Sequence, residues 1–167
     1  MTKPFIIYAL PRSRTLWLSK FLTYGKWECK HDLLAEYIAI PPIVEYLKQP
    51  YRGIIDTGLV VARMQMPEAK IVCIHRKPQE VKDSLAAIGL PGLIDVDLLD
   101  SKLEELRGVK GVRHYNYEDL NDLATCADIA QFCTGQFSVQ WWRCLCNANI
   151  QIDISKGPPH GQFQINS

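Results

Sequence analysis

A short apolar run near the N-terminus limits the possible folds of this chain most strongly. Residues Phe5–Leu10 form a continuous apolar segment, which fits a strand that is buried on both faces. Strands of this kind occur in parallel sheets whose two faces are covered by helices. The run therefore predicts an α/β domain.

Strand and helix patterns alternate along the rest of the chain. Three further segments have strand-like patterns: Gly53–Asp56, Ala69–His75 and Val112–Tyr117. Segments with helical spacing of apolar residues separate them: Thr15–Gly25, Asp32–Ile40, Leu59–Met66, Lys77–Ile88, Val96–Leu106, Leu120–Phe132 and Ser138–Ile150. Pro41 and Pro42 follow the second of these segments and are expected to interrupt the helix there. Short joints between these segments predict a mainly parallel central sheet flanked by helices. Because the sequence has no internal repeat or long linker, we expect one domain over residues 1–167.

The composition argues against several classes of partner. The 167 residues carry a formal net charge of +1, so the global basic field typical of nucleic-acid-binding proteins is missing. No apolar run approaches the roughly 18–20 residues that span a bilayer, and the N-terminus lacks the apolar core of a signal peptide. We therefore expect a cytoplasmic protein that binds neither nucleic acid nor membranes.

The six cysteines fit reduced thiols in such a compartment. Their spacings, taken with those of the histidines, match no standard zinc site. We expect free thiols and no bound metal.

The loop Pro11–Trp17 joins the first predicted strand to the first predicted helix. Such a turn presents free backbone N–H groups at the positive end of the helix dipole. Arg12 and Arg14 add two cations, and Ser13 and Thr15 add hydroxyl donors that suit phosphate or sulfate oxygens. The loop has neither the glycines nor the lysine of the P-loop pattern G-x-x-x-x-G-K-[ST]. We interpret it as an anion site; the alternative is that Ser13 only caps the helix and both arginines are solvated.

A second cationic position follows the predicted strand Ala69–His75. Arg76 comes directly after this strand, and Ser84 lies eight residues later in the following helix. Ligands of open α/β sheets bind beyond the carboxyl ends of the strands, which places Arg76 on the same edge as the loop Pro11–Trp17. The alternative is a surface ion pair between Arg76 and Glu80, with Ser84 as an ordinary helix-surface hydroxyl. Two cationic sites on one edge suggest a ligand with separated anionic groups.

Three stretches resemble motifs of the sulfotransferase family, whose members use 3′-phosphoadenosine-5′-phosphosulfate (PAPS). Tyr8–Trp17 resembles the family's 5′-phosphosulfate loop, Pro67–Leu85 is similar to its 3′-phosphate segment, and Tyr117–Leu120 resembles a Tyr-Glu-Asp-Leu sequence after a later strand. The resemblance implies a three-layer P-loop NTPase-like α/β fold. It also implies sulfuryl transfer from PAPS to a hydroxyl or amine, with 3′,5′-adenosine bisphosphate (PAP) as product and no metal.

The resemblance also assigns roles to individual residues. Nine residues would hold the nucleotide: Pro11, Arg12, Ser13, Arg14, Thr15, Leu16, Trp17, Arg76 and Ser84. Arg12 corresponds to the catalytic cation of the loop, and Arg76 and Ser84 correspond to the pair that binds the 3′-phosphate. Arg14 and Leu16 depart from the pattern, because the family usually has glycine at the first position and often a hydroxyl residue at the second.

A general base must take the proton of the acceptor, and the resemblance does not supply one. Many family members have a Lys-Thr-His motif before the 3′-phosphate strand, but Gly58 stands at the position of that histidine. The candidates are Asp56, which ends a predicted strand on the ligand edge, His31, whose side-chain type suits the role, and Asp32. The alternatives are a helix N-cap for Asp56 and an ordinary half-buried or surface histidine for His31.

Three functions stay open at this point. The leading one is a sulfotransferase that acts on a small-molecule or exposed-group acceptor. A non-catalytic nucleotide-binding module would explain the short chain and the missing histidine. A kinase-like phosphotransferase is disfavoured by the absence of a Gly-Lys-Ser/Thr loop.

Overall fold

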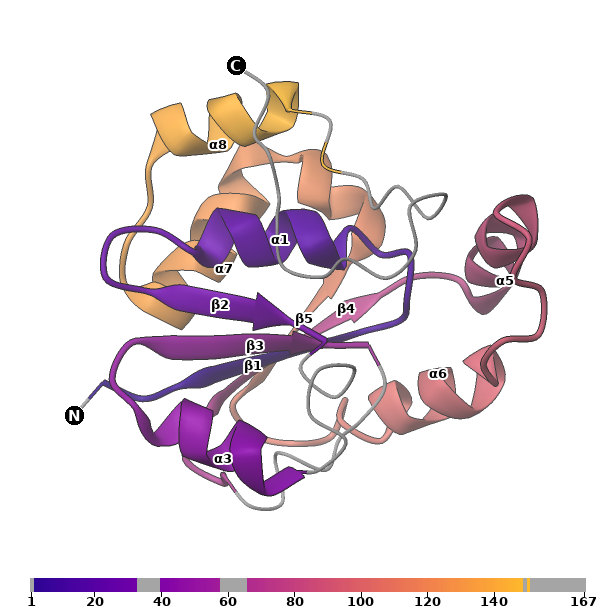
Figure 1. Cartoon of the computed structure of the whole chain (residues 1–167), viewed down its shortest axis with the longest axis horizontal. Coiled ribbons are helices and arrows are strands. Elements are labelled where there is room, and N and C mark those ends of the chain that lie inside the picture. The colour runs from indigo at the N-terminus through magenta and orange to yellow at the C-terminus, as the bar shows by residue number, and fades with distance from the viewer. Residues whose placement is uncertain (1, 33–39, 58–65, 149, 151–167) are drawn as a thin grey trace.

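A parallel five-stranded sheet runs through the centre of the computed structural model (Figure 1). The structure describes residues 2–32, 40–57, 66–148 and 150. The strands are β1 (Phe5–Ala9), β2 (Glu28–His31), β3 (Arg52–Asp56), β4 (Lys70–His75) and β5 (Val112–Asn116), in the spatial order β2-β3-β1-β4-β5. All four neighbouring pairs are parallel, so the carboxyl ends of the strands lie at one edge of the sheet.

Helices cover both faces of this sheet. The α-helices are α1 (Thr15–Leu22), α3 (Ile40–Lys48), α5 (Pro78–Ala87), α6 (Val96–Glu104), α7 (Leu123–Thr134) and α8 (Val139–Asn147), and η1 (Tyr117–Asn121) is a 3₁₀-helix. Helices α1, α7 and α8 pack on one face, and α3, α5 and α6 pack on the other (Figure 1). The predicted three-layer, P-loop-like α/β fold with a parallel central sheet is confirmed.

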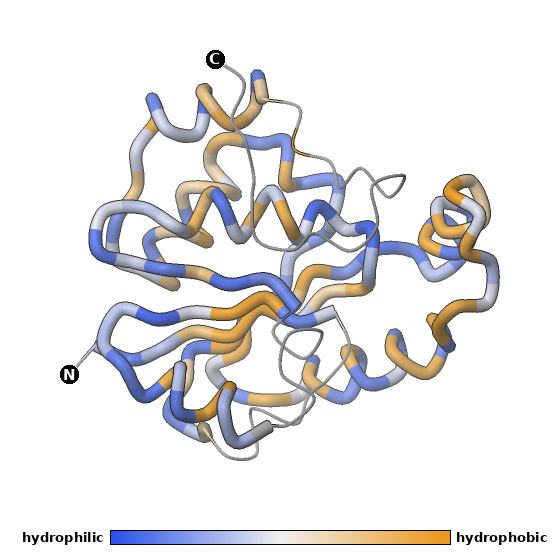
Figure 2. The backbone as a smooth tube through the Cα atoms, viewed as in Figure 1, coloured by the Kyte–Doolittle hydropathy of each residue, from blue (hydrophilic) through white to orange (hydrophobic). Residues whose placement is uncertain are grey.

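Alternating side chains of the strands feed two hydrophobic cores. Successive residues of a strand point to opposite faces, and β1 accordingly sends Ile7 to the core under α1 and Ile6 to the core under α3. All five residues of β1 are buried, as expected for the central strand of a covered sheet. Figure 2 shows hydrophobic residues concentrated along the central strands, while polar and apolar residues alternate along the helices. Each fully buried Leu or Ile contributes about 1.5–3 kcal/mol.

The predicted elements differ from the structure in three places. The edge strand β2 was not predicted. Pro41 and Pro42, expected to interrupt a helix, lie in the first turn of α3, where the missing N–H of proline costs no hydrogen bond. The segment Leu120–Phe132 divides into η1 and α7. The predicted helices Asp32–Ile40 and Leu59–Met66 lie mainly outside the described residues.

Within the described part of the chain, no helix is both long enough and apolar enough to cross a membrane. All six cysteines carry free thiols; four of them are buried, while Cys144 and Cys146 are exposed.

Candidate nucleotide-binding site

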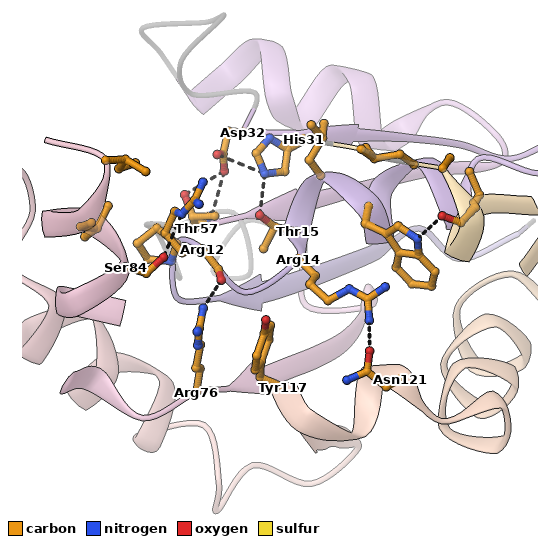
Figure 3. Close-up of a pocket in the computed structure, with 18 of the residues that line it drawn as sticks. Arg12, Arg14, Thr15, His31, Asp32, Thr57, Arg76, Ser84, Tyr117 and Asn121 are labelled. Atoms are coloured by element: carbon orange, nitrogen blue, oxygen red, sulfur yellow. Dashed lines mark hydrogen bonds and ion pairs between the residues drawn. The ribbon is translucent and has the colours of Figure 1, made fainter. Parts of the chain in front are cut away.

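A cavity of about 620 Å³ opens at the carboxyl edge of the sheet (Figure 3), within the usual size of small-molecule sites. Residues that follow the ends of β1, β3, β4 and β5 contribute to its wall. The described lining residues are Pro11, Arg12, Arg14, Thr15, Leu16, Trp17, His31, Asp32, Thr57, Arg76, Ser84, Leu85, Ile88, Leu90, Tyr117, Asn121, Leu145, Cys146, Ala148 and Ile150. The structure thus brings together eight of the nine residues assigned to nucleotide binding.

The loop between β1 and α1 takes a left-handed path. Arg12 and Arg14 have φ angles of 63° and 55°, a conformation that glycine adopts far more readily than other residues. This explains physically why glycine suits the position of Arg14. Arg14 is the N-cap residue of α1, and its side chain makes no capping hydrogen bond. The first N–H groups of α1 therefore receive no side-chain cap from Arg14. They can donate hydrogen bonds to an anion held by the loop.

Ser13 is the ninth assigned residue, and it lies outside the cavity wall. Its side chain is fully buried, and its hydroxyl has no hydrogen-bond partner among the described residues. The alternative in which Ser13 caps α1 is therefore not observed. A buried hydroxyl without a partner costs about 1–3 kcal/mol, and an anion held by the loop would offer this hydroxyl an acceptor. In this respect the residues fit a phosphate or sulfate group.

Hydrogen bonds join the loop to the segment after β4. Arg12 Nε donates to Ser84 Oγ at 3.2 Å, and an Arg76 N–H donates to the carbonyl oxygen of Arg12. The Arg76 guanidinium also lies 4.1 Å from the ring centre of Tyr117, and its Nε is 3.5 Å from a carboxylate oxygen of Glu80. The ion pair with Glu80 that was the alternative for Arg76 is thus present, but Arg76 also lines the cavity (Figure 3).

Arg14 extends to the other end of the cavity. Its NH1 donates to Asn121 Oδ1 at 2.6 Å and to the carbonyl oxygen of Leu120 at 3.1 Å. Its guanidinium lies 4.4 Å from the ring centre of Trp17. Trp17 is only 5% exposed, and its Nε1 donates to the carbonyl oxygen of Leu145. Trp17 therefore acts mainly as a packing residue that supports Arg14.

His31 and Asp32 line the cavity on the side of β2. His31 Nε2 lies 2.8 Å from Thr15 Oγ1 and 3.4 Å from Asp32 Oδ2. Burial lowers the pKa of His31, and the nearby Asp32 carboxylate opposes this shift. Asp32 Oδ1 accepts hydrogen bonds from both the backbone N–H and the hydroxyl of Thr57. A neutral imidazole at the mouth of the loop is chemically suited to accept a proton.

Asp56 points to the opposite face of the sheet. It pairs in register with Tyr8, and it shares its strand face with Ile54, which belongs to the core under α3. His31 pairs with Ile55, which belongs to the core under α1. Asp56 is 8% exposed and is not among the described lining residues of the cavity. The geometry therefore favours His31 over Asp56 as a base.

Among the cavity residues that were not anticipated as site residues, three carry hydroxyl or amide groups: Thr57, Tyr117 and Asn121. Thr57 and Tyr117 directly follow β3 and β5, so the rule that ligands bind beyond the carboxyl ends of strands would have found them. Asn121 comes from the end of η1 and carries no such signal. Among the described residues, no group of three His, Cys, Asp or Glu side chains is arranged to hold a metal ion.

Solved structures with the same fold include proteins complexed with PAP. Mouse sulfotransferase SULT7A1, complexed with PAP, superposes with a TM-score of 0.61 at 18% identity and covers 86% of this chain. This chain has a sulfotransferase-like fold. The resemblance seen in the sequence is confirmed at that level, although the chain spans only 62% of the length of the mouse protein.

Two further structures extend the comparison. Retinol dehydratase in complex with androsterone and inactive cofactor PAP has a TM-score of 0.51 at 15% identity, over 85% of this chain and 62% of its own. A gluconokinase from Sinorhizobium meliloti has a TM-score of 0.50 at 11% identity, over 87% of this chain and 94% of its own. No protein-family model and no curated protein matches the sequence. At these identities the likeness concerns the fold.

Proposed function

We propose that this protein binds PAPS and transfers its sulfuryl group to a hydroxyl or amine of an acceptor. The observation that carries the proposal is the contact between two anion-binding segments that lie far apart in the sequence. Arg12 reaches Ser84 across 72 positions, and Arg76 reaches the backbone of Arg12 across 64. A ligand with two separated anionic groups matches this arrangement better than a ligand with one.

Each segment would hold one end of the nucleotide. The N–H groups at the start of α1, with Ser13 and Thr15, are suited to the 5′-phosphate. Arg76 and Ser84 are suited to the 3′-phosphate, and the guanidinium of Arg76 is positioned by the ring of Tyr117. Arg12 belongs to the loop and reaches Ser84 of the other segment, so its charge can stabilise negative charge that develops during transfer.

Catalysis would depend on positioning and electrostatics. PAPS supplies an activated sulfuryl group when it is bound. The chain must then orient the acceptor and remove its proton. His31 can accept that proton because its lowered pKa keeps the imidazole neutral near pH 7. Asp32 and Thr15, which contact the same ring nitrogen, would position it. Asp56 stays a second candidate base.

A kinase-like phosphotransferase is the second candidate function, favoured by the fold similarity to the gluconokinase. The loop Pro11–Trp17 contains no glycine or lysine, and those residues bind the phosphates of the nucleotide in P-loop enzymes. We therefore rank sulfuryl transfer first.

The test of catalysis compares wild-type protein with His31→Gln. The glutamine amide can still reach Thr15 but takes no proton near neutral pH. PAP release from PAPS is measured with a panel of alcohols, phenols and amines, and PAP affinity is measured by calorimetry. We expect the variant to lose roughly 10²- to 10⁴-fold in turnover while its affinity for PAP changes little.

If His31→Gln keeps full turnover, Asp56→Asn becomes the decisive variant. If both variants keep full turnover, the base is a different residue. Binding of PAP without turnover of any acceptor would favour the non-catalytic module.

A further inference from the structure

The side chain of Arg14 extends away from the contact between the two anion-binding segments. Figure 3 shows its side chain directed toward Asn121, while Arg12 and Arg76 lie near Ser84 and Tyr117. Both hydrogen bonds of its NH1 go to neutral oxygens, those of Leu120 and Asn121. Neither of these contacts neutralises the charge of the guanidinium, because neither acceptor is a carboxylate. The two hydrogen bonds also fix the position of the guanidinium.

The support behind this guanidinium is an aromatic stack. Trp17 and Phe21 lie with ring centres 5.2 Å apart and an interplanar angle of 16°. Arg14 lies over the Trp17 ring at 4.4 Å and lines the cavity. Trp17 also lines the cavity, but because it is only 5% exposed, Arg14 offers a ligand the larger contact surface.

A fixed guanidinium backed by an aromatic ring is a planar surface for another π-system. Arginine stacks on aromatic faces because it is planar, delocalised and weakly hydrated. The wall of the same cavity also contains small or apolar residues at the end of α8, namely Leu145, Cys146 and Ala148. A flat aromatic ring can contact both the guanidinium and these apolar groups, whereas a hydrated phosphate gains nothing from the apolar groups.

We propose that Arg14 is the platform on which the nucleobase stacks, and that it makes the site specific for a nucleotide over a base-free bisphosphate. This inference rests on the proposed function, since it names the residue that would bind the base of the same ligand. It also gives a role to the residue that stands where sulfotransferases usually have glycine.

The test measures affinity for two probes by calorimetry: PAP, and ribose 3,5-bisphosphate, which carries both phosphates but no base. Arg14→Lys keeps the charge and removes the planar surface, and Arg14→Gly removes the side chain while suiting the positive φ of the position. Arg143→Lys, an exposed arginine on α8, is the matched control. We expect both Arg14 variants to lose roughly 5- to 100-fold in PAP affinity and to bind ribose 3,5-bisphosphate as the wild type does.

Each other outcome overturns the inference. Equal losses for both probes would show that Arg14 serves phosphate binding or loop structure. Unchanged affinity of both Arg14 variants for PAP would show that the base lies elsewhere. Failure of the wild-type protein to bind PAP at all would remove the proposed function itself, and is thus distinguishable from failure of the Arg14 variants alone.

Discussion

Strained residues mark the loop between β1 and α1. The positive φ angles of Arg12 and Arg14 cost on the order of 1–3 kcal/mol each, so the surrounding contacts must enforce them. The bonds of Arg76 to the Arg12 carbonyl and of Arg14 to η1 provide this enforcement. Backbone strain that neighbouring contacts maintain is typical of ligand-binding loops.

The hydroxyl of Ser13 gives a prediction for the same loop. In the ligand-free protein this buried group has no partner, so Ser13→Ala should leave the free energy of unfolding unchanged or raise it by about 1 kcal/mol. The same substitution should weaken PAP binding roughly 10-fold or more, because a hydrogen bond to a charged ligand is lost. Urea denaturation and calorimetry measure the two effects.

Ser19 is the matched control for Ser13. It is also buried, but its Oγ donates to the carbonyl oxygen of Leu16 at 2.8 Å. Ser19→Ala should therefore destabilise the protein by about 1 kcal/mol. Destabilisation by Ser13→Ala of the same size, with PAP affinity intact, would show that Ser13 has only a structural role.

Gly53 on β3 leaves room for the side chain of Phe5 on the neighbouring strand β1. A Cβ atom at this position would lie 2.1 Å from Cζ of Phe5 on β1, and Phe5 is fully buried. Gly53→Ala should therefore lower the free energy of unfolding by about 1–3 kcal/mol through overpacking. Gly108→Ala is the control, since a Cβ there meets nothing within 4 Å. Equal urea midpoints for the two variants would contradict the packing described for β1 and β3.

At the scale of elements, a pair formed by the buried His75 and the half-buried His114 connects β4, β5 and α6. His75 Nε2 lies 2.9 Å from His114 Nδ1, and Glu104 and Arg107 face the pair from the region of α6. Burial, followed by the charge of Arg107, lowers the pKa of both histidines from the ordinary 6.5. Folding therefore favours their neutral forms.

Stability should consequently fall in mildly acidic solution. A histidine whose pKa is lowered in the folded state binds fewer protons there than in the unfolded chain, so the free energy of unfolding falls as pH drops below 6.5. Urea denaturation between pH 7.5 and 5 measures this slope, and His75→Gln/His114→Gln should reduce it. Carboxylates lose their contribution at lower pH, near their own pKa values. A wild-type stability that is level over this interval would contradict the account.

The strands and helices differed in how well the sequence predicted them. β1 was readable because all of its side chains are buried and apolar. β2 is a four-residue edge strand with one buried side chain, Cys29, and its polar residues give no strand signal. The contact between His31 and Thr15 depends on this strand, so that contact could not be predicted either.

At the scale of the whole molecule, the site is assembled from segments that only the fold brings together. The positions of Arg12, Arg76 and Ser84 at one edge followed from the alternation of strands and helices. The direction of the Arg14 side chain did not, because it depends on Asn121, 107 positions away. The orientation of Asp56 toward the other face likewise depends on the register of β3 against β1.

The central claim is that the carboxyl edge binds a nucleotide with separate 5′- and 3′-phosphates. Calorimetry with PAP, adenosine 5′-phosphate and ATP tests it most directly, using wild-type protein, Arg76→Ala and the control Arg113→Ala, whose arginine pairs with Asp128 on the surface. A charge-assisted contact of about 1.5–3 kcal/mol should make PAP bind roughly 10- to 100-fold more tightly than adenosine 5′-phosphate. Arg76→Ala should abolish most of that preference, and Arg113→Ala should retain it. Wild-type protein that binds ATP or adenosine 5′-phosphate as tightly as PAP would contradict the claim.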